Sequence, residues 1–249
     1  MINFQGGLAV AVENIIVVVI FLLIQLFADK LISSEKIGRF SWLSFSGGVA
    51  VSFIFVYILP YLHDEQSKYG ESSFRGLTFE SEFYLLSLVG LIIYFVIHNF
   101  AVRAYHSTSR GEGQFFWIQI AFFALYNSMV AYTVFGSDVE GLQTVFYGVA
   151  IGLHFMAISH DLHREDAGRY KRGRFYLAGG ILFGWIFAIV FTLPEIVLAI
   201  TFAVIAGAMI FNVLKKEMPT EESAHLPTFL WAAFAYTVVT EILKLLFNW

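Results

Sequence analysis

Apolar residues along the chain gather into long runs that are separated by short stretches of charged and polar residues. The runs cover residues 8–28, 41–61, 83–102, 115–135, 142–161, 175–193, 196–214 and 227–247. An α-helix rises about 1.5 Å per residue, so each run has about the length needed to cross a hydrocarbon core ~30 Å thick. The pattern therefore predicts an all-α integral membrane protein with eight transmembrane helices.

The alternative membrane-spanning architecture is a β-barrel, whose strands alternate lipid-facing and lumen-facing side chains over about ten residues. The run at residues 15–28 reads IIVVVIFLLIQLFA and does not alternate. The composition agrees with helices in a membrane, since 58% of the 249 residues are hydrophobic and only 14% are charged. A soluble domain carries about 25% charged residues, so this class is excluded.

The division between the sixth and seventh runs depends on a four-residue break at residues 192–195. Pro194 disfavours helix at the residue before it and makes a tight turn plausible there. Without this break the run would be about 40 residues long, which exceeds a single membrane crossing.

Basic residues give an independent test of this division, because Lys and Arg accumulate in short loops on the cytoplasmic side. Twelve of the 15 basic residues fall in alternate connections, at residues 30–39, 103–110, 164–174 and 215–216. The other connections and the C-terminal run hold Lys68, Arg75 and Lys244. This asymmetry predicts eight crossings with both the N- and C-termini outside.

The chain is expected to form one polytopic membrane domain over residues 1–249, with the lipid bilayer as its partner. It has no basic face for nucleic acid, and a homodimer is compatible with its composition. It contains no cysteine, so a metal site would have to use His, carboxylate or amide ligands. The first run lacks the features of a cleaved signal peptide. We expect a bacterial or archaeal plasma (inner) membrane.

Polar side chains inside the runs are candidates for function, because such groups are costly at membrane depth. His154 lies deep in the fifth run, with His160, Asp161 and His163 toward its inner end. Imidazole and carboxylate suit Zn, Mn or Fe and also suit a proton relay. Alternatively, His154 makes an interhelical hydrogen bond, and the other three residues begin a hydrated interfacial loop.

Other polar and small residues allow both a functional and a packing interpretation. Glu13 either faces a water-filled vestibule or lies near the interface, and Asn127 is either a ligand or an interhelical contact. A local ion pair is expected between Glu241 and Lys244. Pairs of small residues, including Gly148 with Gly152, Gly180 with Gly184, and the Ser46-Gly47-Gly48 cluster, permit close helix packing or a thin gate.

Two segments together resemble the ZIP (ZRT/IRT-like) divalent metal transporters. SFSGGVAVSFIFVYILPYLHDE, which begins at Ser44, is similar to that family's glycine-containing second helix ending in Leu-Pro. FAVIAGAMIFNVLKKEMP, which begins at Phe202, is similar to its small-residue helix before a charged turn. The resemblance extends from about Trp42 to Trp249 and implies a ZIP-like bundle of eight helices.

The chain departs from the family where the metal ligands are expected. The family's His-Asn-x-x-acid-Gly motif corresponds here to residues 126–131, YNSMVA, in which only Asn127 matches. In the fifth helix His154 is retained, but Ile158 stands where the family has a carboxylate. The resemblance thus carries over His154 and Asn127 as ligands, with Tyr126 beside them, and implies an altered or lost metal site.

The leading hypothesis is a ZIP-like transporter, not an enzyme, in which the second, fourth, fifth and seventh helices enclose a pathway. Its cargo would be a weakly bound divalent metal (Zn, Mn or Fe) or another small solute, and no cofactor is assigned. Pathway residues would include Tyr126, Ser46 and Glu13. The alternatives are a non-transporting relative, such as a sensor, assembly factor or subunit, and a membrane redox enzyme that binds haem through His98, His154 or His160.

Overall fold

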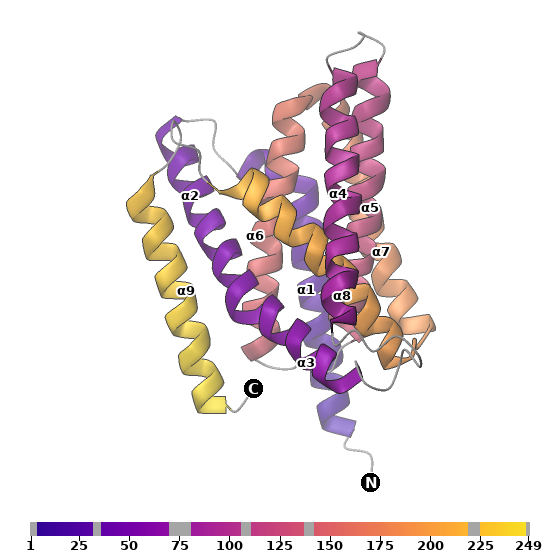
Figure 1. Ribbon diagram of the computed structural model, residues 1–249, viewed down its shortest axis with the longest axis vertical. Helices are drawn as coiled ribbons and strands as arrows, with labels where there is room; N and C mark the ends of the chain where they lie inside the picture. The colour runs from indigo at the N-terminus through magenta and orange to yellow at the C-terminus, as the bar shows by residue number, and fades with distance from the viewer. Residues whose placement is uncertain are drawn as a thin grey trace. The chain divides into compact units, whose positions relative to one another are not determined.

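The computed structural model describes residues 4–31, 36–69, 81–105, 111–136, 142–218 and 225–247. These residues form helices joined by short connections, and no strand occurs among them. The helices are α1 (Phe4–Leu31), α2 (Lys36–Phe53), α3 (Leu59–Tyr69), α4 (Glu82–Tyr105), α5 (Gly111–Gly136), α6 (Leu142–Glu165), α7 (Ala167–Val190), α8 (Glu195–Asn212) and α9 (Leu226–Phe247). Two π-helical turns, η1 (Ile54–Ile58) and η2 (Val213–Glu217), follow α2 and α8 (Figure 1).

Six helical segments in the described part of the chain are long and apolar enough to cross a membrane. They correspond to α2 with η1 and α3, to α4, α5 and α7, to α8 with η2, and to α9. In α1, the apolar segment Ile15–Ala28 is shorter. An all-α architecture with helices long and apolar enough to span a membrane is therefore confirmed, whereas eight crossings and the positions of the termini stay predictions.

The helices form two compact units that alternate along the chain. The first unit contains residues 1–34 and 116–192, and therefore α1, α6, α7 and most of α5. The second contains residues 35–115 and 193–249, and therefore α2, α3, α4, α8 and α9. Each unit thus has its own set of packed helices.

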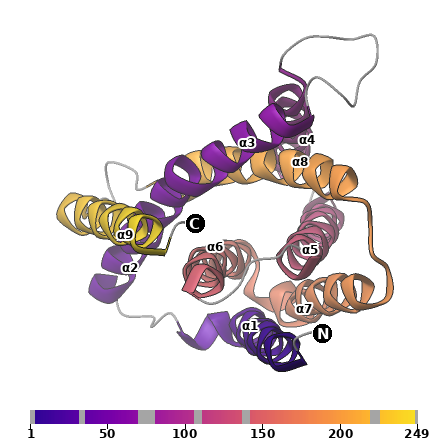
Figure 2. The same cartoon turned by 90° about the horizontal axis from the view of Figure 1, so that it is seen from below.

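In the first unit, glycines bring α7 against the backbone of α5, and Figure 2 shows these two helices side by side. A Cβ atom on Gly180 would overlap the carbonyl oxygen of Ala124, and one on Gly184 would overlap that of Ser128. Because a glycine has no side chain, the two helices can approach this closely. The predicted close-packing role of Gly180 and Gly184 is confirmed.

In the second unit, α4 crosses α8 through a reciprocal pair of glycines. A Cβ on Gly90 of α4 would overlap the carbonyl oxygen of Val204, and one on Gly207 of α8 would overlap that of Ser87. The neighbouring pair of α2 and α9 lies side by side in Figure 1 and is joined by Ser52, whose hydroxyl donates to the carbonyl of Ala233 at 2.9 Å.

The connection between α6 and α7 is much shorter than predicted. The expected loop at residues 162–174 is wrong, because α6 continues to Glu165 and α7 begins at Ala167. Asp166 is the only residue between the two helices, and its side chain caps α7 by accepting from the backbone N–H of Arg169 at 2.8 Å. This cap satisfies one of the free amides at the helix start, so the basic segment can be helical. The predicted break before α8 is confirmed at residues 191–194.

Pro60 lies inside a continuous helical run and not at its end. The prediction that the second span ends at residue 61 is wrong, because the helix continues as α3 to Tyr69. Proline has no N–H, so Pro60 cannot donate to the carbonyl of Val56, which would be its partner in an α-helix and which lies in the π turn η1. Lys244 on α9 donates from Nζ to this carbonyl at 2.6 Å. A side chain from α9 thus donates to a carbonyl to which Pro60 cannot donate.

Candidate functional site

The predicted site residues Tyr126, Asn127 and His154 are all buried in the first unit. Tyr126 and Asn127 are consecutive residues of α5, and His154 lies on α6. The Tyr126 hydroxyl lies 3.2 Å from Nε2 of His154, and the two rings meet edge to face. Neither Asn127 nor His154 has any exposed surface.

Asn127 makes its hydrogen bond to a different neighbour. Its Nδ2 donates to the backbone carbonyl of Leu177 on α7 at 3.2 Å. This contact is possible because Gly180 and Gly184 hold α7 against α5, as described above. Asn127 therefore makes its hydrogen bond at the interface between α5 and α7, whereas His154 makes its hydrogen bond at the interface between α5 and α6.

The predicted cytoplasmic ligands lie at the C-terminal end of α6, in a helix and not in an interfacial loop. His160 Nδ1 is 4.0 Å from the carboxylate of the adjacent Asp161. The ring of His163 packs edge to face on Tyr170 of α7, with 5.4 Å between ring centroids. His163 is therefore part of the packing between α6 and α7, although its metal role stays a prediction.

Hydrogen bonds join α1 to α6 and α7 at this end of the unit. They are made by polar residues that the sequence analysis did not single out. The hydroxyl of Ser159 donates to Oε1 of Gln25 at 2.5 Å, and both side chains are fully buried. Arg174 donates from Nη1 to the carbonyl of Leu26 at 3.0 Å. The available signal was a glutamine inside an otherwise apolar run, which indicates a buried partner by the same rule applied to His154.

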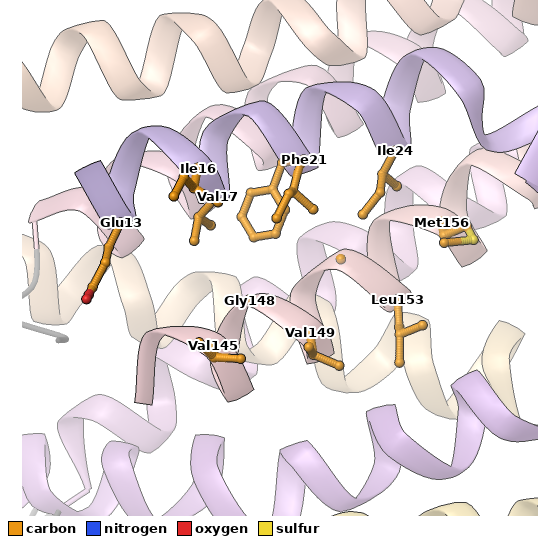
Figure 3. Close-up of a pocket in the computed structure, with 12 residues that line it drawn as sticks. Glu13, Ile16, Val17, Phe21, Ile24, Val145, Gly148, Val149, Leu153 and Met156 are labelled. Atoms are coloured by element: carbon orange, nitrogen blue, oxygen red, sulfur yellow. The ribbon is translucent and has the colours of Figure 1, made fainter. Parts of the chain in front are cut away.

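Glu13 lies at one end of a groove between α1 and α6, and Figure 3 shows Met156 at the other end. The groove has a volume of about 630 Å³. Apolar side chains and the glycines Gly148 and Gly152 line most of it. Glu13 is the one ionisable side chain among the lining residues that the structure describes.

The predicted pathway residue Ser46 and the predicted haem ligand His98 belong to the second unit. Ser46 is buried in α2 and donates to the carbonyl of Leu43 at 3.2 Å. His98 is partly buried on α4, where its ring stacks with that of Tyr94. The four helices predicted to enclose a pathway are divided equally, with α5 and α6 in the first unit and α2 and α8 in the second.

A second buried polar network surrounds the π turn η2, and the sequence analysis missed it. Asn212, the last residue of α8, accepts a hydrogen bond from the hydroxyl of Tyr94 on α4. Its Nδ2 donates to Oε1 of Glu217 at 3.0 Å, and the Glu217 side chain is buried. Gly47 of α2 lies against the backbone carbonyl of Glu217. The network therefore fixes the π turn to two neighbouring helices.

These arrangements are better suited to hydrogen bonding between helices than to binding a metal ion. Within the described ranges, no group of three or more His, Cys, Asp or Glu side chains is placed to hold a metal. The two mid-span candidates, His154 and Asn127, bond to protein groups on different seams. Polar side chains used in this way stabilise membrane helix pairs by about 0.6 kcal/mol on average.

Comparison with known proteins does not assign the chain to a family. No protein-family model matches the sequence, and no curated protein is significantly similar to it.

Proposed function

We propose that the chain is a ZIP-like integral membrane protein that does not carry divalent metal ions. In this proposal it retains the helical bundle and has a non-transporting role, as a sensor, an assembly factor or a subunit of a larger complex. The observation that carries the proposal is the use of His154 and Asn127 in hydrogen bonds on two separate helix seams.

The physical chemistry of a dication supports this proposal. A divalent ion that leaves water must exchange its hydration shell for protein ligands, and carboxylates are needed to offset its charge inside a membrane. Tyr126 and Ile158 occupy positions where the resemblance implies ligands, and Ile158 is a buried apolar residue. One imidazole and one amide leave this charge without compensation.

Metal binding and uptake by the purified full-length protein test the proposal. We would titrate the wild type and His154→Ala with Zn, Mn, Fe and Cd, and measure uptake of the same ions into proteoliposomes. Both proteins are expected to bind no stoichiometric metal and to show the same uptake as empty liposomes. The exposed His225, which bonds to Thr228 at 2.6 Å, provides the matched control variant His225→Ala.

Saturable binding of one metal ion per chain that disappears in His154→Ala and survives in His225→Ala would overturn the proposal. Binding that disappears only in His225→Ala reports a surface histidine and leaves the proposal supported. Metal uptake by the wild type above the empty-liposome level would also overturn it, whichever variant abolishes the uptake.

The π turns favour transport of another small polar solute as the second candidate. η1 interrupts the helical run formed by α2 and α3, and η2 ends the run that contains α8; α2 and α8 are two of the helices predicted to line a pathway. Interrupted helices mark the solute sites of many transporters, and π turns are frequent at functional sites. An osmotic swelling assay with glycerol, urea and neutral amino acids in the same proteoliposomes tests this candidate, which predicts swelling faster than that of empty liposomes.

A further inference from the structure

The groove between α1 and α6 has the dimensions and lining of a site for one lipid acyl chain. Gly148 and Gly152 line it together with aliphatic side chains from both helices, several of which are drawn in Figure 3. Ile16 of α1 is 52% exposed and Val145 of α6 is 54% exposed. Both helices are predicted from the sequence to cross the membrane, and apolar side chains with this exposure on such helices are suited to contact lipid chains.

The position of Glu13 defines where such a chain would begin. From Glu13 to the exposed Lys30 the helix rises about 26 Å, close to the ~30 Å hydrocarbon core, so the predicted crossing of α1 would place Glu13 near one border of the core. From Glu13 to Ile24, the last groove residue of α1, the rise is about 16 Å. This length matches the ~15 Å depth of one leaflet.

The charge of Glu13 defines the headgroup. Acyl chains resemble one another chemically, so an apolar groove does not by itself distinguish one phospholipid from another. A carboxylate at the mouth of the groove favours a headgroup that carries positive charge and N–H donors, because hydrogen bonds between ionised groups are the strongest. We propose that this groove binds an aminophospholipid, with one acyl chain between α1 and α6 and its primary ammonium at Glu13.

Native mass spectrometry of the full-length protein tests the proposal with three lipids that share the same acyl chains. Palmitoyl-oleoyl-phosphatidylethanolamine has an ammonium with N–H donors, the phosphatidylcholine has a quaternary ammonium without them, and the phosphatidylglycerol has no ammonium. The wild type is expected to bind one phosphatidylethanolamine about fivefold more tightly than either of the others. Equal affinities for the three lipids would overturn the proposal.

The variant Gly148→Leu places a side chain in the groove, and Gly179→Leu is its matched control. A Cβ on Gly148 would lie 3.8 Å from Val17, in ordinary contact, so that the leucine side chain can extend into the groove. A Cβ on Gly179 of α7 would have no neighbour within 4 Å. Gly148→Leu is expected to weaken phosphatidylethanolamine binding about fivefold, and Gly179→Leu to leave it unchanged. Equal binding by the two variants would overturn the groove as the site.

The variant Glu13→Gln separates the headgroup from the chain. It preserves the shape of the groove and removes the negative charge, so the preference for phosphatidylethanolamine over phosphatidylcholine is expected to fall to about one while lipid is still bound. An unchanged preference would overturn the assignment of the ammonium to Glu13. If Gly148→Leu does not fold, which size-exclusion chromatography would reveal, the result for Glu13→Gln decides the proposal.

Discussion

Lys244 is placed where its charge both forms an ion pair and compensates for a proline. Its Nζ donates to Glu241 on the same helix at 3.1 Å, as expected from their spacing. The same atom donates to the Val56 carbonyl, to which Pro60 cannot donate. A cation at this position therefore links α9 to the irregular turn before α3.

The variant Lys244→Met is expected to lower the free energy of unfolding by about 1–2 kcal/mol, because it removes a charge-assisted hydrogen bond between helices. The same substitution should cost about half as much in a Pro60→Ala background, where the alanine N–H can donate to Val56. Denaturation in mixed micelles, followed by circular dichroism, measures this double-mutant cycle. Additive effects of Lys244→Met and Pro60→Ala would contradict the proposed compensation.

The site residues show what a sequence can and cannot reveal at this scale. The position of His154 in the middle of an apolar run was sufficient to mark it as a buried polar group. Its partner Tyr126 was not predictable, because the contact depends on how α5 and α6 are rotated against each other. The hydrogen bond from Asn127 to a backbone carbonyl depends likewise on the separation of α5 and α7. Residue type indicates the need for a partner, whereas packing selects the partner.

At the scale of elements, glycines at the contacts between helices set the distances between the helix axes. Gly180→Ala is expected to lower the free energy of unfolding by about 1–3 kcal/mol, because the added Cβ would overlap the backbone of Ala124 and force α5 and α7 apart. Gly179→Ala, one residue earlier, should be neutral or slightly stabilising, since its Cβ meets open space and alanine favours helix. The same denaturation assay compares the two variants, and equal losses of unfolding free energy would contradict the close contact between α5 and α7 at Gly180.

The extents of the helices were predictable only where a local signal decides them. Pro194 directly precedes the first residue of α8, and α7 ends shortly before it at Val190, so the break lies where local proline chemistry predicts it. The corner at Asp166 was missed, because a basic stretch reads as a loop unless the capping role of a single aspartate is recognised. The continuation of the helix past Pro60 could not be read locally at all, since its extra donor, Lys244, is far away in the sequence.

At the scale of the whole molecule, two contacts within the second unit agree with the alternating direction predicted for its helices. In the second unit, Lys68 near the end of α3 pairs with Glu195 at the start of α8 at 2.9 Å. At the other end of the unit, the backbone N–H of His225, directly before α9, donates to Ser44 in the first half of α2 at 3.1 Å. In the predicted topology the first pair lies outside and the second inside, so each contact joins segments on one side of the membrane.

The native chain has no cysteine, so single-cysteine variants can report which side of the membrane each exposed residue faces. Asp64→Cys, on α3, should react with a membrane-impermeant maleimide in right-side-out vesicles, because residues 62–82 are predicted to lie outside. Lys171→Cys on α7 and Lys215→Cys after α8 should react only after permeabilisation, because an odd number of predicted membrane crossings separates each of them from Asp64. All three residues are exposed, so burial would not limit their labelling. Labelling of Lys171→Cys and Lys215→Cys from opposite sides would mean that α7 and α8 do not both cross, and the eight-helix topology would be wrong.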